Sequence, residues 1–176
     1  MCLASWLKQV PGQVVVIIDS CGSGAAVYNS NGGPGDAVAN ASAKGASADF
    51  SPEAFDEAVV NAFESEDKGV MAPGIDEGAF VIRNKFYVLT ASAYQEACWT
   101  KGDKYSYFTK WLTDGIKTKG SMPADADKNK LTTLNELYKY IKKQGSKLEI
   151  EANGVKYKQH VQVYPSNSGF ELFYRK

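Results

Sequence analysis

The chain has 176 residues, of which 44% are hydrophobic and 23% charged, and this is enough for one globular domain with a sizeable core. Its 20 basic and 20 acidic side chains give a formal net charge of zero, which argues against a nucleic acid or an anionic membrane as the main partner. The three cysteines are spaced too irregularly for a disulfide framework or a zinc site, no apolar run is long enough to span a membrane, and Met1–Leu3 do not begin a signal peptide. The cellular location therefore stays open.

The first predicted elements are a helix over residues 3–10 and a strand over Val14–Ile18. An unbroken β-branched run is typical of a strand that is buried on both faces of a parallel sheet. The glycine-rich turn after it places Cys21 at the edge where open α/β sheets bind ligands, which favours a reactive thiol. The alternative is an inert buried cysteine, and reactivity would require a nearby histidine. A helix leading straight into such a strand is half of a βαβ crossover, so we expect that the N-terminal part of the domain is missing.

Residues 22–50 are rich in Gly, Ala, Ser and Asn, and we predict a flexible insertion there. Ser51-Pro52 predicts the start of a helix, which Lys68-Gly69 ends. The apolar runs at residues 80–82 and 86–89 predict either a short hairpin or an approach to a second buried strand, and residues 70–78 are predicted to be irregular. The remaining predicted elements are helices over residues 105–120 and 134–143 and strands over residues 148–150, 156–164 and 170–174.

Two of these stretches carry a resemblance to a known family. The apolar strand followed by Asp-Ser-Cys-Gly-Ser-Gly at residues 19–24 resembles the nucleophile strand of caspase-like cysteine peptidases, especially metacaspases, clostripain-like enzymes and legumains. Tyr87–Trp99 resembles the strand and loop that wall their specificity pocket, and Tyr107–Gly115 resembles the helix that follows. The resemblance implies an α/β three-layer sandwich with a mostly parallel central sheet, in a single partial domain that spans residues 1–176.

The resemblance also implies a chemistry, the hydrolysis of peptide or protein substrates by a Cys–His dyad without any cofactor. Cys21 would be the nucleophile, and its backbone N–H would contribute to the oxyanion hole. Asp19 matches an acid that pairs with an arginine or lysine of the substrate, and the alternative is a turn residue that binds its own backbone. Thr90 and Ser92 would line the same pocket.

The catalytic histidine is the main departure from the family. In the family it lies on the strand before the nucleophile strand, but no histidine precedes Cys21, and we interpret His160 as a structural residue of a partly exposed strand. We therefore expect that a missing N-terminal segment or a second chain supplies the base and that the isolated chain is inactive. The alternative is a catalytically inactive caspase-like module that binds peptides or scaffolds a partner. An unrelated flavodoxin-like domain is disfavoured because no phosphate-binding lysine motif follows the glycines.

Two further features bear on regulation. Lys44 and Lys68, in or beside the insertion, are candidates for self-cleavage, against the alternative of a flexible segment with incidental lysines. Residues 125–136 match the spacing of an EF-hand calcium loop, although Lys130 occupies the sixth position, where glycine is usual. The alternative is an acidic loop followed by a capping box from Thr133 to Glu136. The candidate Ca²⁺ ligands are the side chains of Asp125, Asp127, Asn129 and Glu136 and the carbonyl of Leu131.

Overall fold

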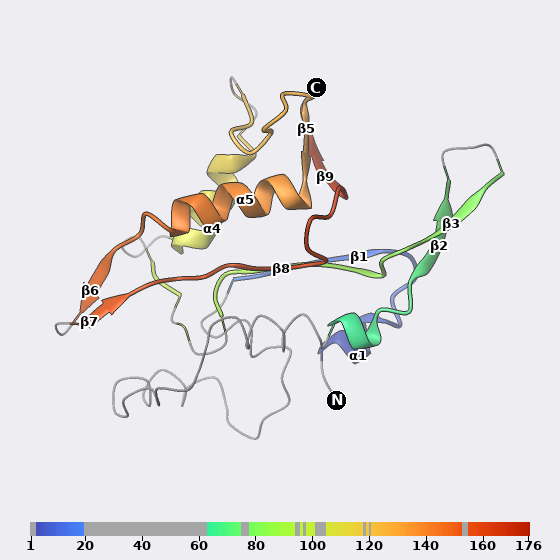
Figure 1. Cartoon of the computed structure of the whole chain (residues 1–176), viewed down its shortest axis with the longest axis horizontal. Helices are drawn as coiled ribbons and strands as arrows, with labels where there is room; N and C mark the ends of the chain where they lie inside the picture. Colours follow the sequence, from blue (N-terminus) through green and yellow to red (C-terminus); the bar gives the residue numbers. More distant parts are fainter. Residues whose placement is uncertain are drawn as a thin grey trace.

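The computed structural model describes residues 3–19, 63–74, 78–93, 96, 98–100, 105–117, 119, 121–152 and 155–176. This part of the chain is a mixed α/β structure with one three-stranded mixed sheet, several two-stranded antiparallel sheets and few helices (Figure 1). In these ranges no helix has the length and apolar character that a membrane crossing needs. The predicted insertion at residues 22–50 lies outside the described residues, as does the start of the helix predicted from residue 52.

The central sheet consists of β1 (Val14–Ile18), β4 (Phe86–Thr90) and β8 (Gln162–Tyr164), with β4 in the middle. β1 and β4 are parallel and in register along their whole length, whereas β8 is antiparallel to β4. A backbone bond of 2.9 Å from the N–H of Ala91 to the carbonyl of Ile18 continues the parallel ladder beyond both strands. The two apolar runs at residues 14–18 and 86–89 were therefore correctly predicted as strands, and their carboxyl ends lie at the same edge of the sheet. The prediction that residues 14–18 are buried on both faces is wrong, because β1 is the outer strand of the described sheet and Val15 and Ile17 are each 42% exposed.

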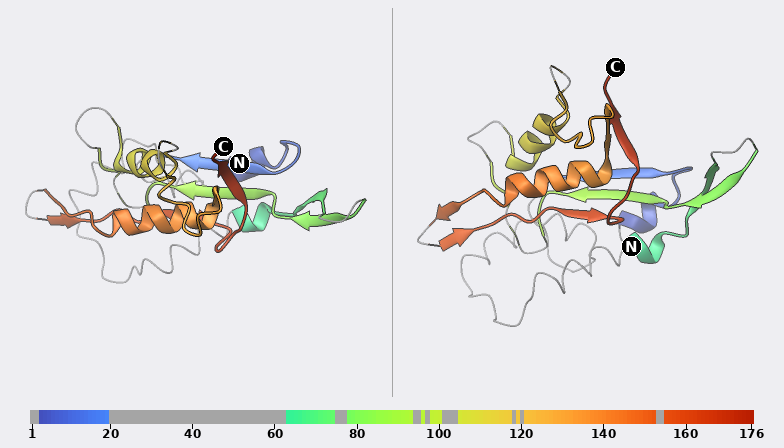
Figure 2. Two further views of the ribbon diagram at one scale, coloured as in Figure 1. Left: turned by 90° about the horizontal axis from the view of Figure 1, so that it is seen from above. Right: turned by 45° about the horizontal axis from the view of Figure 1, so that its top comes forward.

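β4 is buried at all five positions because helices cover both faces of the sheet. Tyr87 and Leu89 pack against the apolar sides of α4 (Tyr107–Gly115) and α5 (Leu134–Gly145). Phe86 and Val88 point to the opposite face, where they meet α1 (Leu3–Leu7) and the helical residues 63–66. The two groups of helices are seen on opposite sides of the sheet in Figure 1, and the right-hand view of Figure 2 shows the same arrangement from a tilted direction. The alternation of side chains along one strand therefore builds two separate apolar clusters.

α4 and α5 begin and end for identifiable reasons. The Ser106 side chain caps α4 by accepting a hydrogen bond of 2.9 Å from the backbone N–H of Thr109. α4 ends at Gly115, earlier than the predicted residue 120, and a Cβ at Gly115 would lie 2.9 Å from Tyr140 Cδ1, so this close approach of α4 to α5 requires glycine. α5 begins with a capping box between Thr133 and Glu136, the feature that belonged to the alternative interpretation of the acidic loop.

A two-stranded antiparallel ribbon lies where the sequence predicts irregular structure. β2 (Val70–Pro73) pairs with β3 (Phe80–Arg83), although residues 70–78 were expected to be irregular. β3 does not form a hairpin with β4, because both edges of β4 are already occupied by β1 and β8. The ribbon points away from the central sheet (Figure 1).

The C-terminal part of the chain forms two further strand pairs. β5 (Leu131–Thr133) pairs with β9 (Glu171–Tyr174), and β6 (Ile150–Ala152) pairs with β7 (Val155–Tyr157). The sequence predicts these strands approximately, but it places all of them at the end of the main sheet. The single strand predicted over residues 156–164 is wrong, because β7 and β8 are separate strands and His160 lies between them, outside both. Among the described C-terminal strands only β8 joins the main sheet.

Candidate functional site

The predicted pocket residues lie at the carboxyl edge of the β1–β4 pair. Asp19 directly follows β1, and Thr90 is the last residue of β4, opposite Ile18 in the register. Thr90 and Ser92 are both 0% exposed, and the Thr90 hydroxyl donates to the Ser92 carbonyl at 3.4 Å. Cys21, the predicted nucleophile, lies outside the described residues. The structure therefore brings together three of the four predicted residues at one edge, with Asp19 exposed and the other two buried.

Asp19 is held by the N-terminal turn of α4. Its Oδ2 accepts hydrogen bonds from the hydroxyls of Ser106 and Thr109. The turn that follows Asp19, to which the structural alternative assigned its side chain, lies outside the described residues, and no lysine or arginine of the described residues forms an ion pair with the carboxylate. This contact could not be inferred from the sequence, because Ser106 and Thr109 lie 87 and 90 residues further along the chain.

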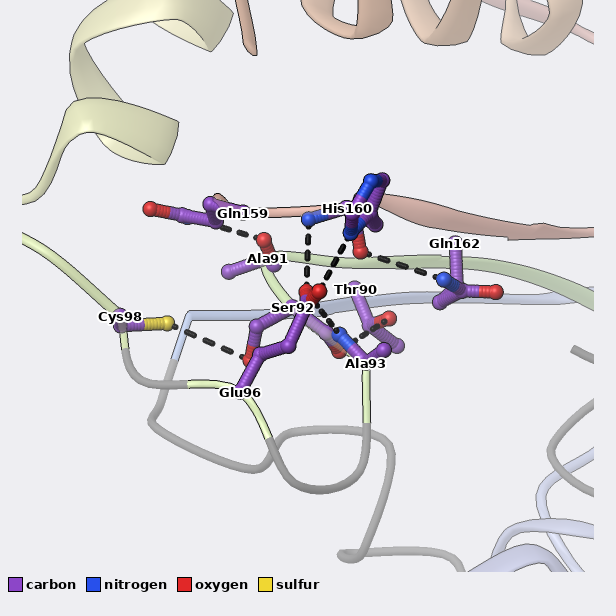
Figure 3. A network of polar contacts seen from close by, with 9 residues as sticks. All are labelled: Thr90, Ala91, Ser92, Ala93, Glu96, Cys98, Gln159, His160 and Gln162. Carbon is purple, nitrogen blue, oxygen red and sulfur yellow. Dashed lines mark hydrogen bonds and ion pairs between the residues drawn. The ribbon is translucent and has the colours of Figure 1, made fainter. Parts of the chain in front are cut away.

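The only histidine of the sequence, His160, lies at the same edge as Asp19, shortly before β8. Its Nδ1 contacts Oε1 of Glu96, and its backbone N–H donates to Glu96 Oε2 at 2.7 Å (Figure 3). Glu96 Oε2 also accepts from the backbone N–H of Ala93 at 3.3 Å. The His160 side chain is 50% exposed. Glu96 thus ties the segment after β4 to the segment before β8, which agrees with a structural role for His160.

A buried amide completes this connection. Gln159 is 3% exposed, and its Nε2 donates to the carbonyl of Ala91 at 2.9 Å while its Oε1 accepts from the backbone N–H of Trp99 at 3.3 Å. Cys98 Sγ lies 3.6 Å from Ser92 Oγ and packs against the α4–α5 cluster, as expected for a structural cysteine. The polar side chains that follow β4 are therefore drawn together in one network (Figure 3).

The acidic loop before α5 gathers three carboxylates. One oxygen each from Asp125, Asp127 and Glu136 lies within 4.8 Å of the others, so this triad could hold a metal ion. Lys130 has a φ of 71°, in the left-handed region that an EF-hand loop requires at its sixth position. Lysine therefore does not prevent the turn here, although it adopts this conformation at a greater cost than glycine.

Backbone N–H groups of this loop donate hydrogen bonds to its side-chain oxygens. Asp125 accepts from the backbone N–H groups of Asn129 and Lys130 at 3.1 and 3.0 Å, and Asn129 Oδ1 accepts from the N–H of Leu131 at 2.7 Å. Burial raises the pKa of Glu136, but hydrogen bonds from Thr133 and from the backbone N–H groups of Ala126 and Asp127 together outweigh it, so the pKa of Glu136 lies below its ordinary value. Glu136 is thus ionised at neutral pH, as a metal ligand must be.

Comparisons with known proteins do not identify the chain. No protein-family model matches the sequence, no curated protein matches it, and no solved structure matches it. Of the two lysines predicted as self-cleavage sites, Lys68 is exposed two residues after the helical residues 63–66, whereas Lys44 lies outside the described residues. Function must therefore be argued from the geometry and from the residues themselves.

Proposed function

We propose that the protein is a caspase-like cysteine endopeptidase that cleaves after lysine or arginine, with Cys21 as the nucleophile. The resemblance of residues 14–24 and 87–99 to the two landmarks of that family is the starting point. Parallel pairing of β1 with β4, and helices on both faces of their sheet, are compatible with the three-layer sandwich of this family. The main structural support for the proposal is an exposed carboxylate at the carboxyl edge of the sheet.

That carboxylate is Asp19. It is anchored by two neutral hydroxyl donors and forms no ion pair with a basic side chain of the described residues, so its negative charge is available to a substrate cation. Cys21 follows it by two residues along the chain. A substrate held through a basic side chain at Asp19 would therefore present its scissile carbonyl close to the thiol.

In the proposed reaction, the Cys21 thiolate attacks the scissile carbonyl and forms an acyl-enzyme that water later hydrolyses. The base that removes the thiol proton belongs to a segment or chain outside these residues. Thr90 and Ser92 are both buried at the end of β4, so they would support the substrate site from beneath rather than contact the substrate. Peptide or protein substrates are the partners, and the chemistry uses no cofactor.

Fluorogenic peptides ending in lysine or arginine test this proposal. We expect no turnover by the present chain alone and clear turnover once the segment that carries the histidine is present. Cys21→Ala abolishes that turnover, whereas Cys98→Ala, the matched control, retains it. Turnover by the chain alone that depends on Cys21 would show that a base lies within these residues, and His160→Ala would then identify it.

The second candidate is a catalytically inactive module of the same fold that binds peptides or scaffolds a partner. A complete protein that binds lysine peptides through Asp19 but shows no Cys21-dependent turnover would establish this function. The carboxylate of Asp19 would bind a substrate cation in both an active peptidase and an inactive binding module, so only the catalytic assay distinguishes the two functions.

We also propose that the metal ion suited to the acidic loop is Ca²⁺. Hard oxygen ligands at alternating loop positions and a final carboxylate are what Ca²⁺ prefers. The left-handed conformation of Lys130 and the lowered pKa of Glu136 both support this choice. Calcium bound here would fix the start of α5, and hence the face of α5 that covers Leu89.

Calorimetric titration of the chain with CaCl₂ tests the calcium proposal. Glu136→Gln keeps the length and capping ability of the side chain but removes its charge, so we expect at least about a tenfold loss of Ca²⁺ affinity. Glu149→Gln, at an exposed position just before β6, is the matched control and should bind as the wild type does. No heat from the wild-type protein, or equal binding by Glu136→Gln, would contradict the proposal.

A further inference from the structure

The hydrogen bonds of Asp19 also bear on which cation it accepts, a question that rests on the proposed function. A carboxylate oxygen has two lone-pair directions. On Asp19 both directions of Oδ2 are used, one by the hydroxyl of Ser106 and one by the hydroxyl of Thr109. Oδ1 has no partner among the described residues. The side chain therefore presents one open oxygen and one saturated oxygen.

The Ser106 contact is difficult to release. The same hydroxyl oxygen accepts the backbone N–H of Thr109 at 2.9 Å as the cap of α4, and this leaves its single proton directed at Asp19. The Thr109 hydroxyl makes no other contact among the described residues, so it is the removable one. Asp19 accordingly keeps a fixed orientation, and the occupancy of its Oδ2 depends on Thr109.

Lysine and arginine differ in what they require from a carboxylate. A guanidinium binds best through two parallel hydrogen bonds, one to each carboxylate oxygen. An ammonium is a compact charge that needs only one acceptor oxygen. With Oδ2 saturated, the paired arrangement with a guanidinium cannot form unless one hydroxyl leaves.

We propose that the Asp19 site selects lysine over arginine and that Thr109 is the residue that determines this preference. Ser106 and Thr109 act through Asp19 and are therefore positioning residues, whereas Asp19 alone touches the substrate cation. Removing the Thr109 hydroxyl frees one direction on Oδ2 and makes the paired contact with a guanidinium possible.

Equilibrium binding tests this on the full chain without need of catalysis. Nα-acetyl-lysine amide and Nα-acetyl-arginine amide are titrated at constant ionic strength while the Asp19 carboxyl carbon is followed by NMR. We expect the wild-type protein to bind the lysine probe about fivefold more tightly or better. Thr109→Val should reduce the ratio of lysine affinity to arginine affinity to about one or below, whereas Thr109→Ser, which keeps the hydroxyl, should retain the wild-type ratio. Asp19→Asn should abolish binding of both probes.

Thr113→Val is the matched control on the same helix. Its hydroxyl donates to the carbonyl of Thr109 at 2.8 Å and does not contact Asp19, so the lysine-to-arginine ratio should stay at the wild-type value. The amide spectrum of each variant reports whether α4 is intact. A wild-type protein that binds arginine as tightly as lysine would overturn the proposal, as would a ratio that Thr109→Val leaves unchanged.

These outcomes are separable from failure of the proposed function. If lysine is preferred through Thr109 but the complete protein shows no Cys21-dependent turnover, the peptidase proposal fails and the binding preference stands. If neither probe changes the chemical shift of the Asp19 carboxyl carbon, or if Asp19→Asn leaves binding unchanged, Asp19 has no role in substrate recognition. Both the proposed lysine preference and the proposed substrate pocket are then wrong.

Discussion

Two consecutive strands of similar composition have opposite surroundings. β3 has the sequence Phe-Val-Ile-Arg and is exposed at every position, whereas β4 has the sequence Phe-Tyr-Val-Leu-Thr and is buried at every position. Only Asn84 and Lys85 separate them. Ile82 is 81% exposed and Leu89 is 0% exposed. Apolar composition by itself therefore does not decide which strand enters the core.

What differs is the number of sides on which each strand is covered. β4 has β1 and β8 at its edges and helices on both faces, whereas β3 pairs only with β2. Apolar surface stabilises the fold by roughly 25 cal/mol per Å² only where it is removed from water. The same kind of side chain should therefore contribute several kcal/mol in β4 and almost nothing in β3.

The largest effect is expected from Leu89→Ala. Leu89 lies within the cluster between β4 and the two long helices, so truncation removes buried methyl groups and leaves a cavity. We expect a loss of about 2–5 kcal/mol in the free energy of unfolding, measured by urea denaturation. A loss below about 1 kcal/mol would mean that β4 is not the centre of the core.

An intermediate effect is expected from Asp67→Asn, at the point where β3 and β4 diverge. Asp67 Oδ1 accepts the backbone N–H groups of Lys85 at 2.7 Å and Gly69 at 2.9 Å, and Oδ2 accepts the hydroxyl of Tyr164 at 3.1 Å. Since these bonds join the beginning of β4 to β8 and to the β2 end of the ribbon, we expect the substitution to cost about 1–3 kcal/mol at pH 7.

The effect of Asp67→Asn should depend on pH with a definite sign. Burial raises the pKa of Asp67, but the hydrogen bonds from Lys85, Gly69 and Asn84 together outweigh it, so the folded-state pKa lies below the ordinary value. A carboxyl whose pKa is lowered on folding stabilises the protein above its unfolded pKa of about 4, and that contribution is lost as the pH falls further. The difference between wild type and variant should therefore narrow below pH 4, and a constant difference would contradict this assignment.

The smallest effect is expected from Ile82→Ala in β3. Because Ile82 is already in water, the change in the free energy of unfolding should lie within about 0.5 kcal/mol in the same urea assay. The exposed apolar face of the ribbon, formed by Met71, Phe80 and Ile82, makes this a sharp comparison with Leu89. A cost approaching that of Leu89→Ala would show that the ribbon is covered in solution.

The candidate sites show where local sequence is informative. Thr133 and Glu136 are three residues apart, so a capping box between them follows from helix geometry, and the structure contains this feature of the alternative interpretation. The acidic residues of the preceding loop were likewise recognised by spacing, and they do converge. Lys130 was counted against that loop, but the backbone adopts the left-handed conformation with lysine in place.

Contacts between distant residues could not be inferred in this way. Asp19 was expected to serve either a substrate or its own turn, and its partners are Ser106 and Thr109 on a helix that packs near the sheet edge. Glu96, the partner of His160, was missed for the same reason, since 64 residues separate the two. Nothing in the composition of either segment marks such a pair.

The sequence by itself determined the two parallel strands, the helices that cover β4 and the clustering of acidic residues before α5, because periodicity, capping and ligand spacing act within one element. Only the tertiary structure decided that β4 is enclosed while β3 is exposed, that Asp19 rests on α4, and that β8 rather than β3 pairs with β4. These outcomes depend on which surfaces meet once the chain has folded, and pairing at one edge of β4 excludes every competing strand from it.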